Sequence, residues 1–109
     1  KDYLGECGYS NLGAVIGATY PNELKKLRSL LPGVFLLIPG YGAQGGGAED
    51  VVYGFDKNGS GAIINSSRGI IFAYRNNEKY KEKDFALAAG VAAKNMKEEV
   101  NNALKNYNK

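Results

Sequence analysis

The chain contains no histidine and no tryptophan, and Cys7 is its single cysteine among 109 residues. Without histidine, the chain itself can form neither a Ser-His-Asp triad nor a histidine-ligated metal site. A lone cysteine cannot form an internal disulfide, and no histidine is present to activate its thiol, so Cys7 is expected to be structural or incidental and not a nucleophile. We therefore expect a reducing, cytoplasmic location and no metal.

Long apolar runs and clusters of like charge are also missing. The longest apolar run, residues 34–38, stops at Pro39, far short of the ~20 residues that span a membrane. No basic-then-apolar secretory segment is present. Fourteen Lys and Arg oppose eleven Asp and Glu, and both signs mix in runs such as residues 78–83. This pattern is typical of a solvated surface, so neither a membrane nor a nucleic acid is expected as a partner.

Short apolar runs alternate with segments of helical period three times along the chain. β-branched and apolar residues without polar alternation indicate buried strands, and apolar residues spaced three and four apart indicate amphipathic helices. A further short helix is expected after Arg68. The strands are predicted at residues 12–18, 34–38 and 61–65, and the main helices at residues 21–31, 48–55 and 84–104.

Several side-chain placements follow from these patterns. The strand at residues 34–38 should be covered on both faces. Lys25, Lys26 and Arg28 lie off the apolar face of their helix and should be solvated. Asp84 is expected to cap the final helix. The core positions of that helix are predicted to be Phe85, Ala88, Ala92, Met96, Val100 and Leu104.

Strands alternating with helices predict an α/β fold with three parallel strands joined by right-handed crossovers. Three strands leave two open edges, whereas a complete (β/α)8 barrel needs ~250 residues. Residues 1–109 are therefore expected to form a single-domain part of a larger sheet or barrel, and the piece alone should be poorly stable.

The loop after the second strand matches the dinucleotide-binding pattern G-x-G-x-x-G from Gly40 to Gly45. The next strand ends at Asn65 without the acid that holds the ribose of NAD, although Arg68 could accommodate the 2′-phosphate of NADP. Pro39 interrupts the strand before the first glycine, which disfavours this interpretation. An NADP-binding Rossmann unit nevertheless remains one hypothesis.

A phosphate site in a barrel is the second hypothesis. Barrel enzymes commonly bind phosphate with the loops after their last two strands and a short extra helix. Here two consecutive strands end in loops able to present backbone N–H groups, and the later loop adds Arg68. Its guanidinium can form paired hydrogen bonds to phosphate oxygens, and Gln44 adds a neutral amide.

Three stretches, GAVIGATYPNEL, LIPGYGAQGG and INSSRGI, resemble in order and spacing the C-terminal part of orotidine 5′-monophosphate decarboxylase. The resemblance is to the bacterial branch with G-A-T-x-P and N-S-S-R-G-I patterns. It implies strands six to eight of a (β/α)8 barrel, usually homodimeric, that decarboxylates orotidine 5′-phosphate to UMP in pyrimidine biosynthesis without a cofactor. The N-terminal half of the same barrel would then be a necessary partner.

The resemblance also implies roles for individual residues. Pro39 and Gly40 would lie beside the pyrimidine, Gln44 would bridge toward the phosphate, and Arg68 would be the phosphate arginine. Ser67 stands where glycine is common, so its backbone N–H is the expected donor. The resemblance leaves the role of Tyr41 open.

The family's catalytic D-x-K-x-x-D motif is absent from the 109 residues. Lys57 follows an aspartate but belongs to a helix-to-strand loop, at the wrong end of a barrel for chemistry. No catalytic residue is therefore expected in this chain, which alone should be inactive. The residues leave open another phosphate-binding barrel enzyme, such as a pentulose-phosphate-acting relative, and a non-catalytic phosphate-binding module.

Overall fold

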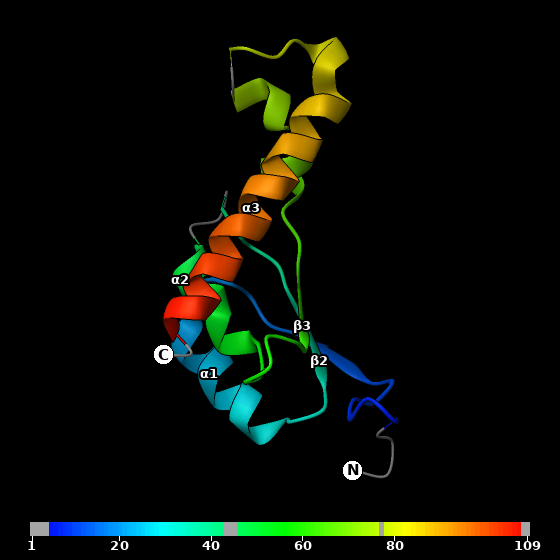
Figure 1. Cartoon of the computed structure of the whole chain (residues 1–109), viewed down its shortest axis with the longest axis vertical. Coiled ribbons are helices and arrows are strands. Elements are labelled where there is room, and N and C mark those ends of the chain that lie inside the picture. Colours follow the sequence, from blue (N-terminus) through cyan, green and yellow to red (C-terminus); the bar gives the residue numbers. More distant parts are fainter. Residues whose placement is uncertain (1–4, 43–45, 77, 108–109) are drawn as a thin grey trace.

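A computed structural model describes residues 5–42, 46–76 and 78–107. Its centre is a parallel sheet of β1 (Gly13–Val15), β2 (Phe35–Ile38) and β3 (Ala62–Ile64), in that order (Figure 1). The register aligns Val15 with Leu37 and Leu37 with Ile63. The predicted parallel strands are thus confirmed, although each is shorter than the apolar run that contains it.

Helices follow each strand, as the sequence predicts. Pro21 opens the first helix, where its missing N–H costs no hydrogen bond, and Gly33 follows the helix with a φ of +87°. The short helix expected after Arg68 is a π-helical turn followed by a 3-10 turn. The helices and turns are α1 (Pro21–Leu30), α2 (Ala48–Val51), η1 (Val52–Gly54), η2 (Ser67–Ile71), η3 (Ala73–Asn76), η4 (Glu82–Asp84) and α3 (Phe85–Tyr107).

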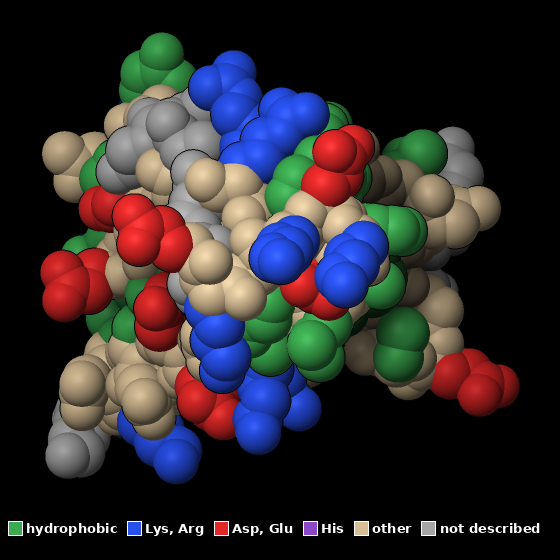
Figure 2. Space-filling view, turned by 90° about the horizontal axis from the view of Figure 1, so that it is seen from above, with side chains coloured by type: hydrophobic (Ala, Val, Ile, Leu, Met, Phe, Trp, Pro, Cys, Tyr) green, Lys and Arg blue, Asp and Glu red, His purple; other side chains and the backbone are tan. Residues whose placement is uncertain are grey.

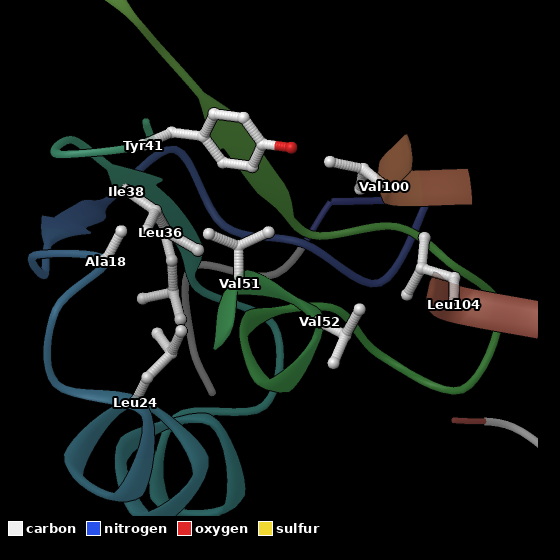
Figure 3. Close-up of a cluster of buried hydrophobic side chains, with 9 residues drawn as sticks. All are labelled: Ala18, Leu24, Leu36, Ile38, Tyr41, Val51, Val52, Val100 and Leu104. Carbon is white, nitrogen blue, oxygen red and sulfur yellow. The ribbon is translucent and has the colours of Figure 1, made fainter. Parts of the chain in front are cut away.

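The core lies between one face of the sheet and the helices (Figure 3). Leu36 and Ile38 of β2 are fully buried, as are Leu24 of α1 and Val51 of α2. The C-terminal half of α3 covers the core on the side away from the sheet. The buried cluster comprises Ala18, Leu24, Leu36, Ile38, Tyr41, Val51, Val52, Val100 and Leu104.

The opposite face of the sheet is open, which corrects the prediction that β2 is covered on both faces. Phe35 and Leu37 alternate with the buried residues of β2 and are 40% and 38% exposed. Their neighbours Val15 and Ile63 are 67% and 58% exposed. Side chains alternate between the faces of a strand, and the described helices cover only one of them.

Two predictions for α3 are wrong. Phe85 is 58% exposed, because the N-terminal half of the helix projects beyond the sheet (Figure 1). Asp84 ends η4, and its carboxylate accepts the N–H of Lys81 at 3.0 Å, so its cap serves that turn. Among the other predicted positions, Ala88, Val100 and Leu104 are buried, whereas Ala92 and Met96 are half-buried.

Arg28 is also placed differently from the prediction, because it is half-buried and not solvated. Its guanidinium donates to the carbonyls of Gly54 at 3.0 Å and Gly61 at 3.1 Å. It also donates to the carbonyl of Val34 at 2.6 Å and to that of Leu31. One side chain of α1 therefore supplies donors to the loops that lead into β2 and β3.

The molecule is elongated, with a radius of gyration of 15.2 Å, against about 13 Å for a compact chain of this length. Seen from above, its upper end carries basic and acidic side chains side by side (Figure 2). This mixture agrees with the solvated surface predicted around residues 78–83. No helix in the described part of the chain combines the length and apolarity needed to cross a membrane.

Candidate functional site

A hollow of about 250 Å³ lies where β2 and β3 end. Four of the predicted site residues, Pro39, Gly40, Ser67 and Arg68, line it together. Gln44, the fifth, lies outside the described residues. The lining is completed by Tyr41, Asn65 and Ser66.

Glycines shape the first loop through both conformation and packing. Gly40 and Gly42 have φ angles of +95° and +78°, a region that residues with a Cβ rarely adopt. The N–H of Gly46 donates to the carbonyl of Gly40 at 3.2 Å. A Cβ on Gly46 would lie 2.5 Å from the Cβ of Ala18. The loop can therefore pack against Ala18, which lies between β1 and α1, only because position 46 carries no side chain.

The second loop turns directly from β3 into η2. Ser66 is extended, and its carbonyl accepts the N–H of Ile70 at 3.0 Å. Gly69 packs so closely that a Cβ there would lie 2.4 Å from the Ser66 hydroxyl oxygen. Arg68 is exposed, and its guanidinium has no partner among the residues that the structure describes. A cation in that position is available to a ligand in the hollow.

Tyr41 connects the two loops to α3. The Ser66 hydroxyl donates to the Tyr41 carbonyl at 3.1 Å, and the Tyr41 hydroxyl donates to Glu99 Oε2 at 2.7 Å. Burial, followed by the hydrogen bond to Glu99 and the charge of that carboxylate, raises the pKa of Tyr41 well above its ordinary value. The phenol therefore remains a protonated donor at neutral pH.

Sequence reasoning assigned no role to three of the lining residues, Tyr41, Asn65 and Ser66. The position of Asn65 and Ser66 immediately after a strand, in the loop that also holds Arg68, was a usable indication. For Tyr41 the sequence offers none, because its partner Glu99 is 58 residues away along the chain.

The lining chemistry suits an oxyanion. Its described residues supply a guanidinium, two serines, an amide and the backbone of Gly40, and none of them is a carboxylate. A larger hollow of about 660 Å³ lies between α2 and the C-terminal end of α3. The described residues that line it include Glu49, Asp50 and Glu99 and no Lys or Arg, so their charge disfavours a phosphate. The hollow at the strand ends is therefore the better candidate.

Comparison with protein-family models finds no match. Comparison with curated sequences does find similar proteins. Orotidine 5′-phosphate decarboxylase of Caldicellulosiruptor bescii is 48% identical over 104 residues, or 95% of this chain and 33% of the relative. The enzyme of Clostridium tetani is also 48% identical, with 95% and 35% coverage. The enzyme of Rhodopirellula baltica is 53% identical over 89 residues, or 82% of this chain and 28% of the relative.

Two solved structures are similar in fold. A Toxoplasma gondii protein described as an orotidine-monophosphate decarboxylase has a TM-score of 0.62 and 31% identity, covering 85% of this chain and 30% of that one. Leishmania donovani UMP synthase has a TM-score of 0.62 and 33% identity, covering 86% and 18%. The chain thus spans about a third or less of the relatives it matches.

These similarities decide between the two folds that the sequence left open. Three parallel strands in consecutive order occur in dinucleotide-binding units as well as in barrels, so topology alone does not separate them. Sequence and structure neighbours both assign the chain to the barrel and match it to the C-terminal part of the enzymes. The chain is similar to the orotidine 5′-phosphate decarboxylases, and it spans about a third of the curated enzymes that it matches.

Proposed function

We propose that this chain supplies the phosphate-binding part of an orotidine 5′-phosphate decarboxylase, which produces UMP and CO2. The observation that carries this proposal is the meeting of Pro39, Gly40, Ser67 and Arg68 in one hollow. The identity of 48% to a decarboxylase over 95% of the chain supplies the reaction.

Each loop has a distinct role in this proposal. The Arg68 guanidinium pairs with the phosphate oxygens, and the backbone N–H of Ser67 donates to the same group. Gln44 bridges from the first loop toward the phosphate. The turn at Pro39 and Gly40 lies beside the pyrimidine ring.

The bond-breaking step belongs to other parts of the barrel. The bond between the pyrimidine and its carboxylate breaks, CO2 leaves, and a proton takes its place on the ring carbon. The chain has no D-x-K-x-x-D motif to deliver that proton. Its contribution is binding energy at the phosphate, which helps to hold the ring in the reacting position. We also propose that the complete barrel is a cytoplasmic homodimer.

The test is a chimera in which this chain replaces the matching segment of the Caldicellulosiruptor bescii decarboxylase; we call it the completed barrel. We expect it to release CO2 from orotidine 5′-phosphate. Arg68→Ala should raise the KM for that substrate by at least ~10-fold, because a charged hydrogen-bonding partner of the phosphate is lost.

Arg75→Ala is the matched control, because it removes an arginine that does not line the hollow. It should leave the KM unchanged. A completed barrel that folds, as judged by circular dichroism and a cooperative melt, but forms no UMP would contradict the proposal.

A further inference from the structure

The two loops of the proposed phosphate site are linked through one residue. Tyr41 directly follows Gly40, and Ser66 directly precedes Ser67. The hydrogen bond from the Ser66 hydroxyl to the Tyr41 carbonyl, 3.1 Å long, therefore joins the two turns that line the hollow. A shift of either residue would change the separation of the loops.

The side chain of Tyr41 is fixed at its far end as well. Its ring is part of the buried core, and the residue is only 8% exposed. Figure 3 shows the ring extending from the end of β2 toward α3. There the hydroxyl donates to Glu99, 58 residues further along the chain. This hydrogen bond connects the residue after Gly40 to α3.

A second hollow next to the two loops explains why the hydrogen bonds of Tyr41 matter for their position. A second hollow of about 240 Å³ shares Tyr41 and Ser66 with the first and continues to Met96 and Glu99 on α3. The two residues therefore separate the candidate phosphate site from an open space. Without the link, the loops would have room to move away from a bound phosphate.

We propose that Tyr41, held by Glu99 and Ser66, is a positioning residue that fixes the separation of the two phosphate-binding loops. This inference rests on the proposed function, and it adds that α3 controls phosphate affinity through one hydrogen-bonded side chain. Neither Tyr41 nor Glu99 needs to touch the substrate for this role.

The test uses the completed barrel and compares ligands with and without a phosphate. Tyr41→Phe removes only the hydroxyl, and Glu99→Ala removes its acceptor. Each should raise the KM for orotidine 5′-phosphate and the Kd for UMP by about 3- to 10-fold, the value of one hydrogen bond. The Kd for uridine should rise less, because uridine lacks the phosphate. Glu99→Gln retains an acceptor oxygen and should restore UMP affinity.

A double variant and two controls make the test specific. The double variant Tyr41→Phe/Glu99→Ala should bind UMP no more weakly than either single variant, because both substitutions break the same hydrogen bond. Ser66→Ala removes the hydrogen bond to the Tyr41 carbonyl without changing the core. It should also weaken the binding of UMP more than that of uridine. Tyr20→Phe and Glu98→Gln change exposed residues and should leave both affinities unchanged.

The outcomes separate this inference from the proposed function. If Arg68→Ala weakens UMP binding while Tyr41→Phe, Glu99→Ala and Ser66→Ala do not, the inference is wrong and the phosphate site stands. Equal loss of UMP and uridine affinity in Tyr41→Phe would show a general structural effect and overturn the inference. If Arg68→Ala leaves UMP binding intact, the proposed phosphate site falls, and the inference falls with it.

Discussion

Tyr9 and Arg28 organise the end of the sheet opposite the candidate site. The Tyr9 ring stacks on Phe35 with centroids 4.6 Å apart, and the Arg28 guanidinium lies 5.9 Å from the Tyr9 ring. The Tyr9 hydroxyl donates to Asp56 at 2.8 Å. This cluster ties the segment before β1 to the loop before β3.

The Asp56 carboxylate makes the stability of this cluster depend on pH. Burial alone would raise the pKa of Asp56, but hydrogen bonds from Ser60, Tyr9 and Asn58, together with the charge of Arg28, lower it overall. A carboxylate with a lowered pKa stabilises the fold above its unfolded value of about 3.9. That stabilisation is lost as the pH falls through the folded-state pKa.

Asp56→Asn should therefore lower the stability of the completed barrel at neutral pH and weaken its acid dependence. Urea denaturation at pH 6 and pH 3 measures both effects. The unsubstituted protein should lose more stability between these pH values than the variant. Glu98→Gln, which removes an exposed carboxylate outside the cluster, should leave the difference unchanged. Identical pH dependence in Asp56→Asn and the unsubstituted protein would refute this role.

The helices and strands themselves were largely predictable, because the spacing of apolar residues and the proline and glycine residues at the element ends are local features of the sequence. Leu24 falls on the buried face of α1, and Pro39 follows the last residue of β2, as the pattern indicates. Side chains whose partners lie far along the sequence were not predictable. Arg28 binds the carbonyls of Gly54 and Gly61, and no periodicity in its own helix points to these partners.

The candidate site was predictable to a similar extent. The glycine pattern and Arg68 indicated an anion site, and both strand-end loops do line one hollow. The sequence indicated that glycines let the backbone approach an anion, but it did not indicate that one of them is needed for packing. Gly46 lies outside the G-x-G-x-x-G match, yet it packs against Ala18 more closely than any side chain would allow.

Two glycine substitutions should therefore have opposite effects on stability. Gly46→Ala would place a Cβ 2.5 Å from that of Ala18 and force the two loops apart. It should destabilise the completed barrel by at least about 1 kcal/mol. Gly90→Ala lies in the interior of α3, where the new Cβ would meet no described atom within 4 Å beyond its own stretch of helix, and it should stabilise the barrel by about 0.5–1 kcal/mol. Thermal melts of both variants measure this, and destabilisation by Gly90→Ala as large as that by Gly46→Ala would contradict it.

The whole molecule has the form of a sheet covered on one side. Val15, Phe35, Leu37 and Ile63 form an apolar face that the described helices do not cover. In a closed barrel, residues on such a face fill the interior. Contiguous apolar surface and unpaired sheet edges promote association.

The 109-residue chain alone should consequently self-associate. Sedimentation velocity at increasing concentration should show species heavier than a monomer. Ile63→Lys, which places a charge on the open face, should reduce the association. Leu30→Lys changes an exposed leucine on α1 and should not. A chain that stays monomeric at every concentration and unfolds cooperatively would show that the open face needs no partner.

The central claim is that the strand-end loops hold the phosphate of a pyrimidine nucleotide. Its most direct test is calorimetric titration of the completed barrel with UMP and with uridine, before and after Arg68→Ala. We predict that the substitution weakens UMP binding by at least ~10-fold and leaves uridine binding unchanged. Unchanged UMP affinity, or an equal loss for both ligands, would contradict the assignment of this hollow as the phosphate site.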